Sequence, residues 1–341
     1  MPQSNSKPFR FIFVLLPRFN SLTLAGLIEP LRIANYCAGA TLYEWGLLSP
    51  ENDSVKNSVG FSLPTAQLNN EAVLACDAVI ICGGWNAEKY HNLRLFRWLK
   101  TLSRRGIKLG AVETGTYILA RAKLLTGYRA AIHWHCSSAF KEQYPDVELC
   151  DQLVVFDRNR MTCAGGAACL DMMLRDIEKH HGKNLAQEVS EQLIYSNPRN
   201  IELPQKNPVA TDPPAPPVLL QSVIDFMNKN IEEPKSIPQV AAQADVSQRK
   251  LERLFKKHFD CSATNYYRMV RLQQARALLT QTEMSVMDIC IACGFTSSSY
   301  FSKSYAKQFG MRPRDHRTAW PESDIVPSWP GLSSKLKTPT E

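Results

Sequence analysis

The sequence runs SIPQVAAQADVS at residues 236–247 and SVMDICIACGFT at residues 285–296, so that one pattern is written twice. The copies are offset by 49 residues at their first serines, Ser236 and Ser285, and by 50 residues after the turn. Self-similarity at a fixed spacing indicates that one structural unit has been used twice.

Each copy has the features of a helix-turn-helix. Its first serine is an N-cap type, and Gln239 or Asp288 follows three residues later, close to a capping box. A short apolar helix comes next. Gly294 then supplies the positive φ of a tight turn, and Asp245 takes that place in the first copy.

The second helix of each copy is predicted to open at Ser247 or at Thr296. In the first copy it places apolar and polar side chains on opposite faces at helical spacing. The apolar face contains Leu251, Leu254, Phe255 and Phe259, and the polar face contains Gln248, Arg249, Glu252, Arg253 and Lys256. One copy alone would fit a small helical bundle with solvated charges, but two copies in register, both basic outside, argue against that alternative.

The charge of this part of the chain points to a nucleic acid. Residues 218–320 contain fifteen Lys and Arg against nine Asp and Glu, a net charge of +6. The whole chain carries +8, so this segment holds most of the excess. A basic face beside a pair of reading helices is the electrostatic footprint of a duplex-binding protein.

The second copy and the residues after it resemble the signature of AraC/XylS-type transcription regulators. The resemblance covers about the last 100 residues and rests on Ile289, Cys293-Gly294-Phe295, Ser299-Tyr300-Phe301, Phe309-Gly310, Pro313 and Arg317. It implies two helix-turn-helix units joined by a rigid helix over residues 264–280, with recognition helices in successive major grooves. Asp260 stands where the family usually has glycine, and Ala263 where it usually has proline, which puts the local turn in question.

The resemblance also implies which side chains contact DNA. The positions expected to lie against DNA are Gln248, Arg249, Glu252 and Arg253 in the first unit, and Ser298, Ser299, Ser302 and Lys303 in the second. Three arginines of the connecting helix, Arg268, Arg271 and Arg276, are candidates for phosphate contacts.

Composition favours a cytoplasmic protein without a membrane span. No run of about 18 apolar residues occurs, and residues 9–16 are too few and too strand-like for a signal peptide. The ten cysteines are scattered without a disulfide framework. Cys290 and Cys293 form a C-x-x-C, but with no second pair nearby they are expected to be buried apolar residues.

The first part of the chain alternates strands with helices. Strands are predicted over residues 9–16, 42–48, 78–82, 107–112 and 153–157, and helices over residues 21–36, 93–103, 167–181 and 185–196. This order predicts a flavodoxin-like, doubly wound α/β sheet with right-handed crossovers, ahead of the all-α tandem helix-turn-helix domain.

Composition also predicts the domain boundaries. Six of the fourteen residues from Pro204 to Pro217 are proline, which behaves as a stiff, extended spacer. We therefore expect a ligand-sensing domain over residues 8–203, a linker over 204–217, a DNA-binding domain over 218–320, and a disordered tail over 321–341.

The sharpest feature of the first domain is KLGAVETGTYILA at residues 108–120, a strand that enters a helix through one tight turn. The turn leaves Glu113 above the carboxyl end of the sheet, where open α/β folds bind ligands. With residues 124–127, 132–134, 163–166 and 170–171, this segment resembles the PfpI/ThiJ, class I glutamine amidotransferase-like domain, and more narrowly the sensor half of AraC-type regulators.

One departure from that family bears on the chemistry. Its catalytic members place cysteine at the elbow because a thiolate is the attacking group, whereas this chain has Glu113. A carboxylate is a poor nucleophile toward amides, and His133 would have no thiol to activate. The domain is therefore expected to bind a ligand without turnover. An amidase or glyoxalase-like enzyme with a DNA-binding appendage is the alternative.

The residues around the elbow suggest a cation. Glu29 takes the place where the superfamily keeps an acidic residue near the elbow, and two carboxylates in one cleft favour a cation between them. Trp85 and Trp134 could offer aromatic faces to a quaternary ammonium group, with Thr114 and His133 completing the pocket. The alternative is ordinary packing by the tryptophans and helix capping by Glu113. No metal or cofactor is expected, since the neighbours His180 and His181 point apart on a helix.

Together these observations predict a ligand-responsive transcription factor, an activator that binds double-stranded operator DNA and RNA polymerase as a homodimer. Its effector would be a small cationic or quaternary-ammonium metabolite such as a betaine, carnitine or a basic amino acid. An architectural DNA binder without an effector is a third alternative.

Overall fold

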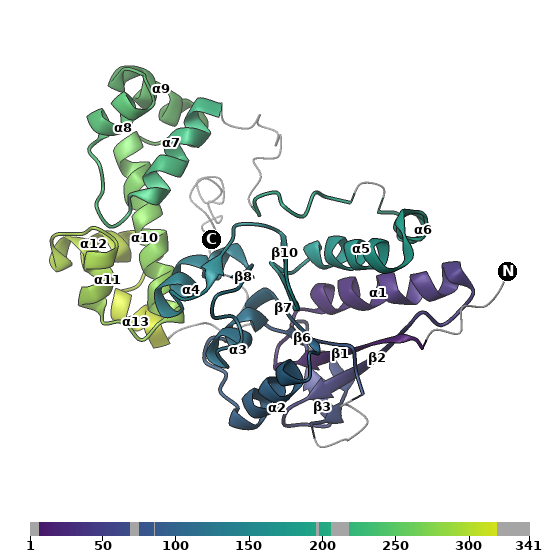
Figure 1. The fold of residues 1–341 in the computed structure, drawn as a ribbon. Coiled ribbons are helices and arrows are strands. Elements are labelled where there is room, and N and C mark those ends of the chain that lie inside the picture. Colours follow the sequence, from purple (N-terminus) through teal and green to yellow (C-terminus); the bar gives the residue numbers. More distant parts are fainter. Residues whose placement is uncertain (1–6, 69–74, 85, 196–197, 206–217, 319–341) are drawn as a thin grey trace, which may run out of the picture. The chain divides into compact units, whose positions relative to one another are not determined.

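The computed structural model describes residues 7–68, 75–84, 86–195, 198–205 and 218–318 (Figure 1). The chain divides into two compact units, Met1–Asn207 and Pro208–Glu341, and the division falls within the predicted proline-rich linker. Most of that linker, residues 206–217, and the predicted tail lie outside the described residues.

The first unit is built on a seven-stranded sheet in the order β10-β11-β7-β6-β1-β2-β5. Every neighbouring pair is parallel except β10 and β11, which are antiparallel at one edge. The strands are β1 Phe9–Leu15, β2 Tyr43–Ser49, β5 Ala66–Gln67, β6 Ala78–Cys82, β7 Lys108–Val112, β10 Val154–Asp157 and β11 Arg160–Cys163.

Helices cover both faces of this sheet, which confirms the doubly wound fold (Figure 1). One face packs against α1, α5 and α6, and the other against α2, α3 and α4. These helices are α1 Ser21–Ala38, α2 Leu93–Arg104, α3 Thr116–Arg121, α4 Ser137–Gln143, α5 Ala168–His181 and α6 Lys183–Gln192. Strand β1 shows the alternation, since Phe11 and Phe13 lie in one core and Ile12 and Val14 in the other.

Several short elements were not predicted. They are the hairpin strands β3 Ser54–Lys56 and β4 Ser62–Pro64, the edge strand β5, the two-residue pair β8 Arg129–Ala130 and β9 Glu148–Leu149, and β11. Helix α6 also ends at Gln192, earlier than the predicted residue 196, because the backbone enters the left-handed region at Ile194, with φ 54°.

The second unit is helical throughout its described part. Its helices are α7 Val218–Lys229, α8 Ile237–Gln243, α9 Gln248–Phe259, α10 Ala263–Gln281, α11 Val286–Ala292, α12 Ser298–Phe309 and α13 Pro313–Thr318. Helix α10 is the connecting helix that the sequence predicted at residues 264–280. It contacts α7 and α9 as well as α11, α12 and α13, so both helix-turn-helix units are built against it.

Local signals explain where these helices begin. Gln239 accepts a hydrogen bond from the Ser236 backbone at 2.9 Å, and Ser285 accepts one from the Asp288 backbone at 3.1 Å. Asp260 ends α9 in the left-handed conformation, with φ 52°, so it fills the position where glycine is usual. Among the described helices, none is both long and apolar enough to cross a membrane.

Candidate effector site and nucleic-acid interface

The elbow forms as the sequence predicted, at the carboxyl end of the inner strand β7. Glu113 has φ 58°, a left-handed conformation that side chains rarely adopt, and begins a short 3-10 turn that leads into α3. Glycine makes this approach possible, because a Cβ at Gly83, just past β6, would lie 2.1 Å from the backbone nitrogen of Gly115. The fold thus holds the Glu113 side chain in one place.

Three donors from two other elements converge on one oxygen of Glu113. Oε1 accepts from Asn20 Nδ2 at 3.0 Å, from Thr23 Oγ1 at 3.3 Å and from the Gly166 backbone at 3.1 Å. Asn20 caps α1, Thr23 is in its first turn, and Gly166 precedes α5. No described residue donates a hydrogen bond to Oε2, so that oxygen is the atom left for a ligand or a proton.

The site also changes the acidity of this carboxyl. Burial raises the pKa of Glu113 above its ordinary range, and the hydrogen bonds from Gly166, Thr23 and Asn20 oppose that rise. Ionisation of Glu113 therefore costs free energy in the folded protein, and a cation near Oε2 would reduce that cost.

The predicted pair of facing carboxylates is not formed, which corrects the interpretation of Glu29. Glu29 makes an ion pair with Arg32, at 2.7 Å, on an exposed part of α1. It is six residues beyond Thr23, about 9 Å further along the helix. The residues that contact Glu113, namely Asn20 and Thr23, were missed because neutral side chains carry no charge signal in the sequence.

The other predicted pocket residues lie in the elbow and in the turn after β8. Thr114 is buried and donates to the Gly84 carbonyl at 2.5 Å, so it supports the elbow. His133 and Trp134 pack together with ring centres 5.4 Å apart, and 36% of Trp134 is exposed. Trp85 lies outside the described residues.

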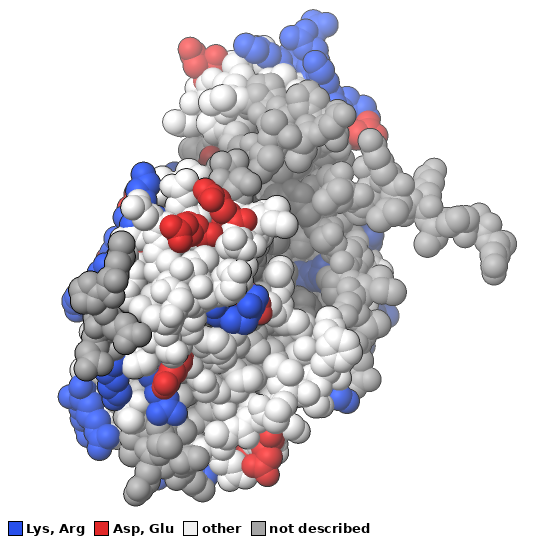
Figure 2. All heavy atoms as spheres, turned by 90° about the vertical axis from the view of Figure 1, so that its right-hand side faces the viewer, with Lys and Arg blue, Asp and Glu red and all other residues white. Residues whose placement is uncertain are grey.

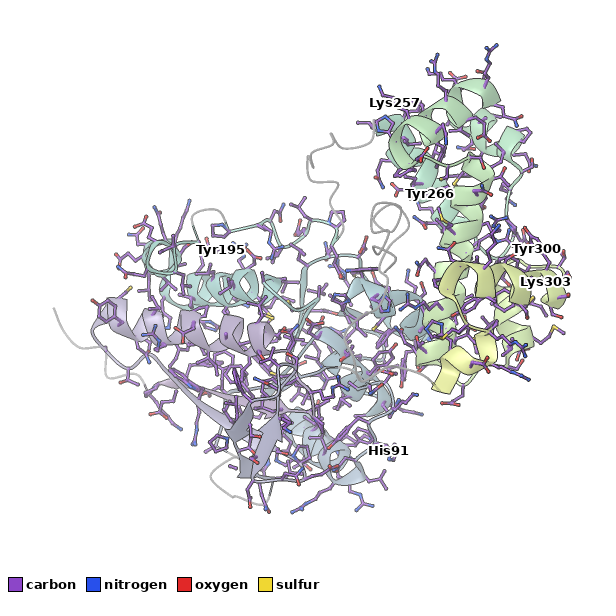
Figure 3. The ribbon with its side chains drawn as sticks, turned by 180° about the vertical axis from the view of Figure 1, so that it is seen from behind. His91, Tyr195, Lys257, Tyr266, Tyr300 and Lys303 are labelled. Atoms are coloured by element: carbon purple, nitrogen blue, oxygen red, sulfur yellow. The ribbon has the colours of Figure 1, made fainter. Side chains whose placement is uncertain are left out.

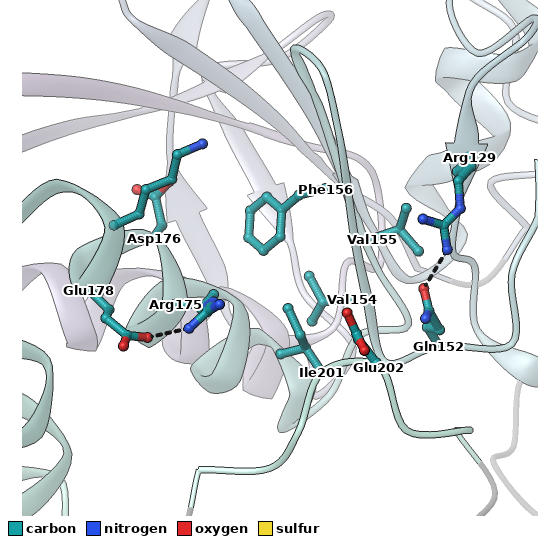
Figure 4. Close-up of a pocket in the computed structure, with 11 residues that line it drawn as sticks. Arg129, Gln152, Val154, Val155, Phe156, Arg175, Asp176, Glu178, Ile201 and Glu202 are labelled. Atoms are coloured by element: carbon teal, nitrogen blue, oxygen red, sulfur yellow. Dashed lines mark hydrogen bonds and ion pairs between the residues drawn. The ribbon is translucent and has the colours of Figure 1, made fainter. Parts of the chain in front are cut away.

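A hollow of about 500 Å³ lies between β10 and α5 (Figure 4). It contains none of the predicted effector residues. Its lining mixes basic, acidic and apolar side chains, among them Arg129, Phe156, Arg175, Glu178, Ile201 and Glu202. Among the described residues, no group of three or more His, Cys, Asp or Glu is arranged to hold a metal ion.

In the second unit the two turns follow the repeat closely. Asp245 has φ 52° and Gly294 has φ 68°, so both occupy the left-handed position that the sequence predicted. Ser247 caps α9 as expected. The second copy is capped by Ser297 and not by Thr296, because its turn contains one more residue.

Helix α9 has one buried and one basic face. Leu251 and Phe255 are fully buried, whereas Arg249 and Arg253 are exposed. Gln248, Lys250, Lys256 and Lys257 are exposed as well. Figure 2 shows Lys and Arg side chains gathered at the upper end of the view, where α9 lies in Figure 1. The arrangement leaves Arg249 and Arg253 accessible to a partner.

Helix α12 repeats this design with fewer charges. Phe301 and Tyr305 are buried, and Ser298, Ser299 and Lys303 are exposed, with Ser302 half-buried. Tyr300, 52% exposed, shares the outer face with Lys303 three residues on (Figure 3). Arg268 of α10 donates to the Tyr300 hydroxyl at 3.3 Å, and this bond lowers the pKa of Tyr300. Tyr300 was missed as a candidate contact, although an aromatic residue among serines was a visible signal.

Three predicted DNA contacts are corrected, because their side chains hold the unit together. Arg271 donates to the Cys293 and Gly294 carbonyls at 2.8 and 2.6 Å and lies over the Phe295 ring. Arg276 is buried, only 4% exposed, beside Phe309. Glu252 accepts a hydrogen bond from the Ala263 backbone at 3.0 Å and so caps α10.

Two helix-turn-helix units with basic outer faces on one shared helix define a protein that binds duplex DNA. The α/β unit ahead of them presents Glu113 at the elbow between β7 and α3. Known proteins share both parts. Residues 12–179 match the DJ-1/PfpI family, and residues 240–319 match a helix-turn-helix domain family.

Relatives match over nearly the whole chain. The HTH-type transcriptional regulator GbdR of Pseudomonas aeruginosa is 40% identical over 325 residues, 94% of this chain and 87% of its own. The regulator CdhR of the same species is 37% identical over 96% of this chain and 97% of its own. An AraC family regulator from Pseudomonas putida of known structure covers 55% of this chain and 100% of its own, with 26% identity and a TM-score of 0.51. The chain belongs to the AraC/XylS-type transcriptional regulators that carry an amino-terminal DJ-1/PfpI domain.

Proposed function

We propose that this regulator responds to a small cationic or quaternary-ammonium metabolite bound at the elbow. The observation that carries the proposal is the geometry of Glu113, whose Oε1 is bonded by three donors while Oε2 has no donor among the described residues. A cation beside Oε2 would stabilise the ionised carboxylate that burial disfavours. Trp134, which packs beside His133 and is 36% exposed, would supply an aromatic face for the cation.

At the DNA end, the proposal assigns base contacts to the exposed side chains of the two recognition helices. These are Gln248, Arg249 and Arg253 of α9, and Ser298, Ser299, Tyr300 and Lys303 of α12, together with the half-buried Ser302. Arg268 would contact phosphate. The regulator would act in the cytoplasm as a homodimer and as an activator that binds RNA polymerase. The ten free thiols suit a reducing compartment.

Catalysis is the competing function. Against it stands the elbow itself, where a glutamate already accepts three hydrogen bonds and no thiol is present. The nearest cysteine in the sequence, Cys136, is buried, and burial raises the pKa of its thiol well above the ordinary range. Turnover of an amide or a 2-oxoaldehyde by the full chain, abolished by Glu113→Ala, would favour the enzyme.

Calorimetry with matched compounds tests the effector. Glycine betaine and 3,3-dimethylbutyrate have the same shape, but only the first carries a positive charge, and choline, carnitine, arginine and glucose extend the series. Wild-type protein is expected to bind a compound with a cationic group in preference to any analogue without one. Glu113→Gln keeps the Oε1 acceptor and removes the charge, so it is expected to abolish that preference. Tight binding of compounds that lack a cationic group, unaffected by Glu113→Gln, rejects the cationic effector.

A further inference from the structure

Helix α5 is connected both to Glu113 and to the segment before the linker. Gly166, just before the helix, bonds Glu113, and Asp171, in its first turn, bonds Arg199. The Gly166 backbone donates to Glu113 Oε1 at 3.1 Å and to Thr23 Oγ1 at 3.0 Å. Helix α5 begins two residues later, and its first turn contains Asp171. Asp171 is therefore only five positions along the chain from an effector-site donor.

Asp171 is a buried charge with a full set of partners. Its carboxylate is 0% exposed and accepts from the Tyr195 hydroxyl at 2.9 Å and from the Arg199 backbone at 2.8 Å. The Arg199 guanidinium adds a hydrogen bond at 3.0 Å and an ion pair at 2.8 Å. We call these three residues the Asp171 clamp. Because an unpaired buried carboxylate is costly, any displacement of Asp171 must carry Arg199 with it or lose these bonds.

Arg199 opens the segment that leads out of the first unit, which we call the exit segment, residues 199–205. Ile201 and Leu203 accept backbone hydrogen bonds from Val154 and Leu153 of the β10 edge, at 3.3 and 3.2 Å. Figure 4 shows Ile201 and Glu202 beside Val154 and Arg175. At its end, Gln205 donates to the Ile132 carbonyl at 2.8 Å, next to His133. The second unit begins at Pro208.

We propose that α5 transmits the state of the elbow to the linker, and that Asp171 is the positioning residue through which the signal passes. A ligand that changes how Glu113 accepts hydrogen bonds changes the position of Gly166, and the rigid helix moves its first turn accordingly. The clamp then alters the exit segment, whatever the placement of the second unit. The purpose of this coupling depends on the proposed effector response, but its existence does not.

The test therefore uses no effector. In the full-length protein, Glu113→Ala removes one of the two acceptors of the Gly166 backbone and leaves Thr23 Oγ1. Hydrogen–deuterium exchange is then measured on peptides covering residues 199–205 and 150–156. We expect exchange there to become at least about fivefold faster, the lower end of ordinary allosteric coupling. Glu113→Gln retains an acceptor at Oε1 and is expected to leave exchange unchanged. In an Asp171→Asn background, Glu113→Ala is expected to add nothing further.

The matched control is on the same helix. Glu178→Gln breaks the exposed Arg175–Glu178 ion pair and is expected to leave the coupling intact. If Asp171→Asn does not fold, Arg199→Gln and Tyr195→Phe replace it. The proposal is overturned if Glu113→Ala leaves hydrogen exchange in the exit segment unchanged. It is also overturned if Glu113→Ala speeds exchange equally in the wild-type and Asp171→Asn backgrounds. Failure of every cationic compound to bind would refute the effector class alone.

Discussion

Glu113 differs from an elbow cysteine in having two oxygens that the fold treats differently. Oε1 accepts hydrogen bonds from residues at the starts of α1 and α5, whereas Oε2 accepts none from the described residues. A thiol offers one weak acceptor and could not hold three donors. The glutamate therefore places at the elbow a carboxylate that forms hydrogen bonds with two other elements, where a cysteine would place a nucleophilic sulfur.

This arrangement predicts an unusual pH dependence for one substitution. The folded-state pKa of Glu113 is raised above its ordinary value of 4.5, so its contribution to stability is fully present below pH 4.5 and is lost as pH rises through the raised value. Glu113→Gln keeps the Oε1 acceptor and cannot ionise. We expect the thermal stability of the variant, relative to wild type, to increase with pH over that window. A difference between the two that stays constant with pH would contradict the raised pKa.

The exposed arginines of α9 give a prediction for DNA binding. If Arg249 and Arg253 contact base edges, Arg249→Ala and Arg253→Ala should each reduce operator affinity by about 1–3 kcal/mol and relax base preference at one position. Lys257, further along α9 and also exposed, is the matched control. Affinities for single-base operator variants measure the effect. A uniform loss across all sequences would reassign the arginines to phosphate contacts.

Sequence patterns predicted local structure, such as turns and helix faces, better than they predicted contacts between residues far apart in the chain. The elbow, both left-handed turn residues and the buried face of α9 follow from neighbours within one or two turns of chain. The bond between Glu113 and Asn20 joins residues 93 positions apart, and nothing near either residue indicates it. Likewise Arg253 and Arg271 look alike in sequence, yet one is exposed and the other is bonded to the turn after α11.

At the scale of elements, the turns of the two helix-turn-helix units have the same left-handed backbone conformation, with aspartate in one and glycine in the other. Asp245 adopts its left-handed conformation in an exposed position. Gly294 has no such freedom, because a Cβ there would lie 2.5 Å from the Ile231 carbonyl oxygen and 2.6 Å from Pro234. The second turn is thus packed against the loop between α7 and α8.

This contrast predicts opposite outcomes for two substitutions. Gly294→Ala adds a left-handed cost of about 1–2 kcal/mol and a backbone clash, so the second unit should be destabilised by more than that amount. Asp245→Gly removes a left-handed cost in open space and should change stability by less than about 1 kcal/mol. Urea unfolding of the full chain measures both. Equal effects would show that the contact with Ile231 is unimportant.

The elements that the sequence analysis did not predict are those without a clear hydrophobic periodicity. Strands β3, β4 and β5 have three residues or fewer, too few to display alternation. Strand β11 has only four residues and runs directly into the Cys163–Gly166 turn, so the sequence pattern did not separate the strand from the turn. Helix α10 contacts five other helices, so Arg276 is buried at a position that a two-sided pattern assigns to solvent.

At the scale of the whole molecule, acid should act on the two units differently. His316 is 6% exposed, its Nδ1 lies 2.9 Å from the Tyr305 hydroxyl, and burial together with the Arg276 charge lowers its pKa to about 4. A depressed histidine contributes stability that is complete above its ordinary pKa of 6.5 and is lost as pH falls toward 4. Glu113 has the opposite sign, because its protonated form is the favoured one.

Calorimetry of the full chain at several pH values tests this difference. The transition of the second unit is expected to move to lower temperature between pH 6.5 and 4, and His316→Gln should weaken that dependence. The transition of the first unit is expected to respond less to His316→Gln at every pH. An acid response of the second unit that is unchanged in the variant would assign it to other groups.

One shared helix also limits the promoters that this regulator can use. Helix α10 has 19 residues, a rod of about 28 Å, and both reading units are bonded to it, through Glu252 at one end and Arg271 in the middle. Inserting one base pair between the two recognised segments rotates the second by about 34° around the duplex. A rod cannot follow that rotation, so spacing within the operator should be fixed more strictly than the bases themselves.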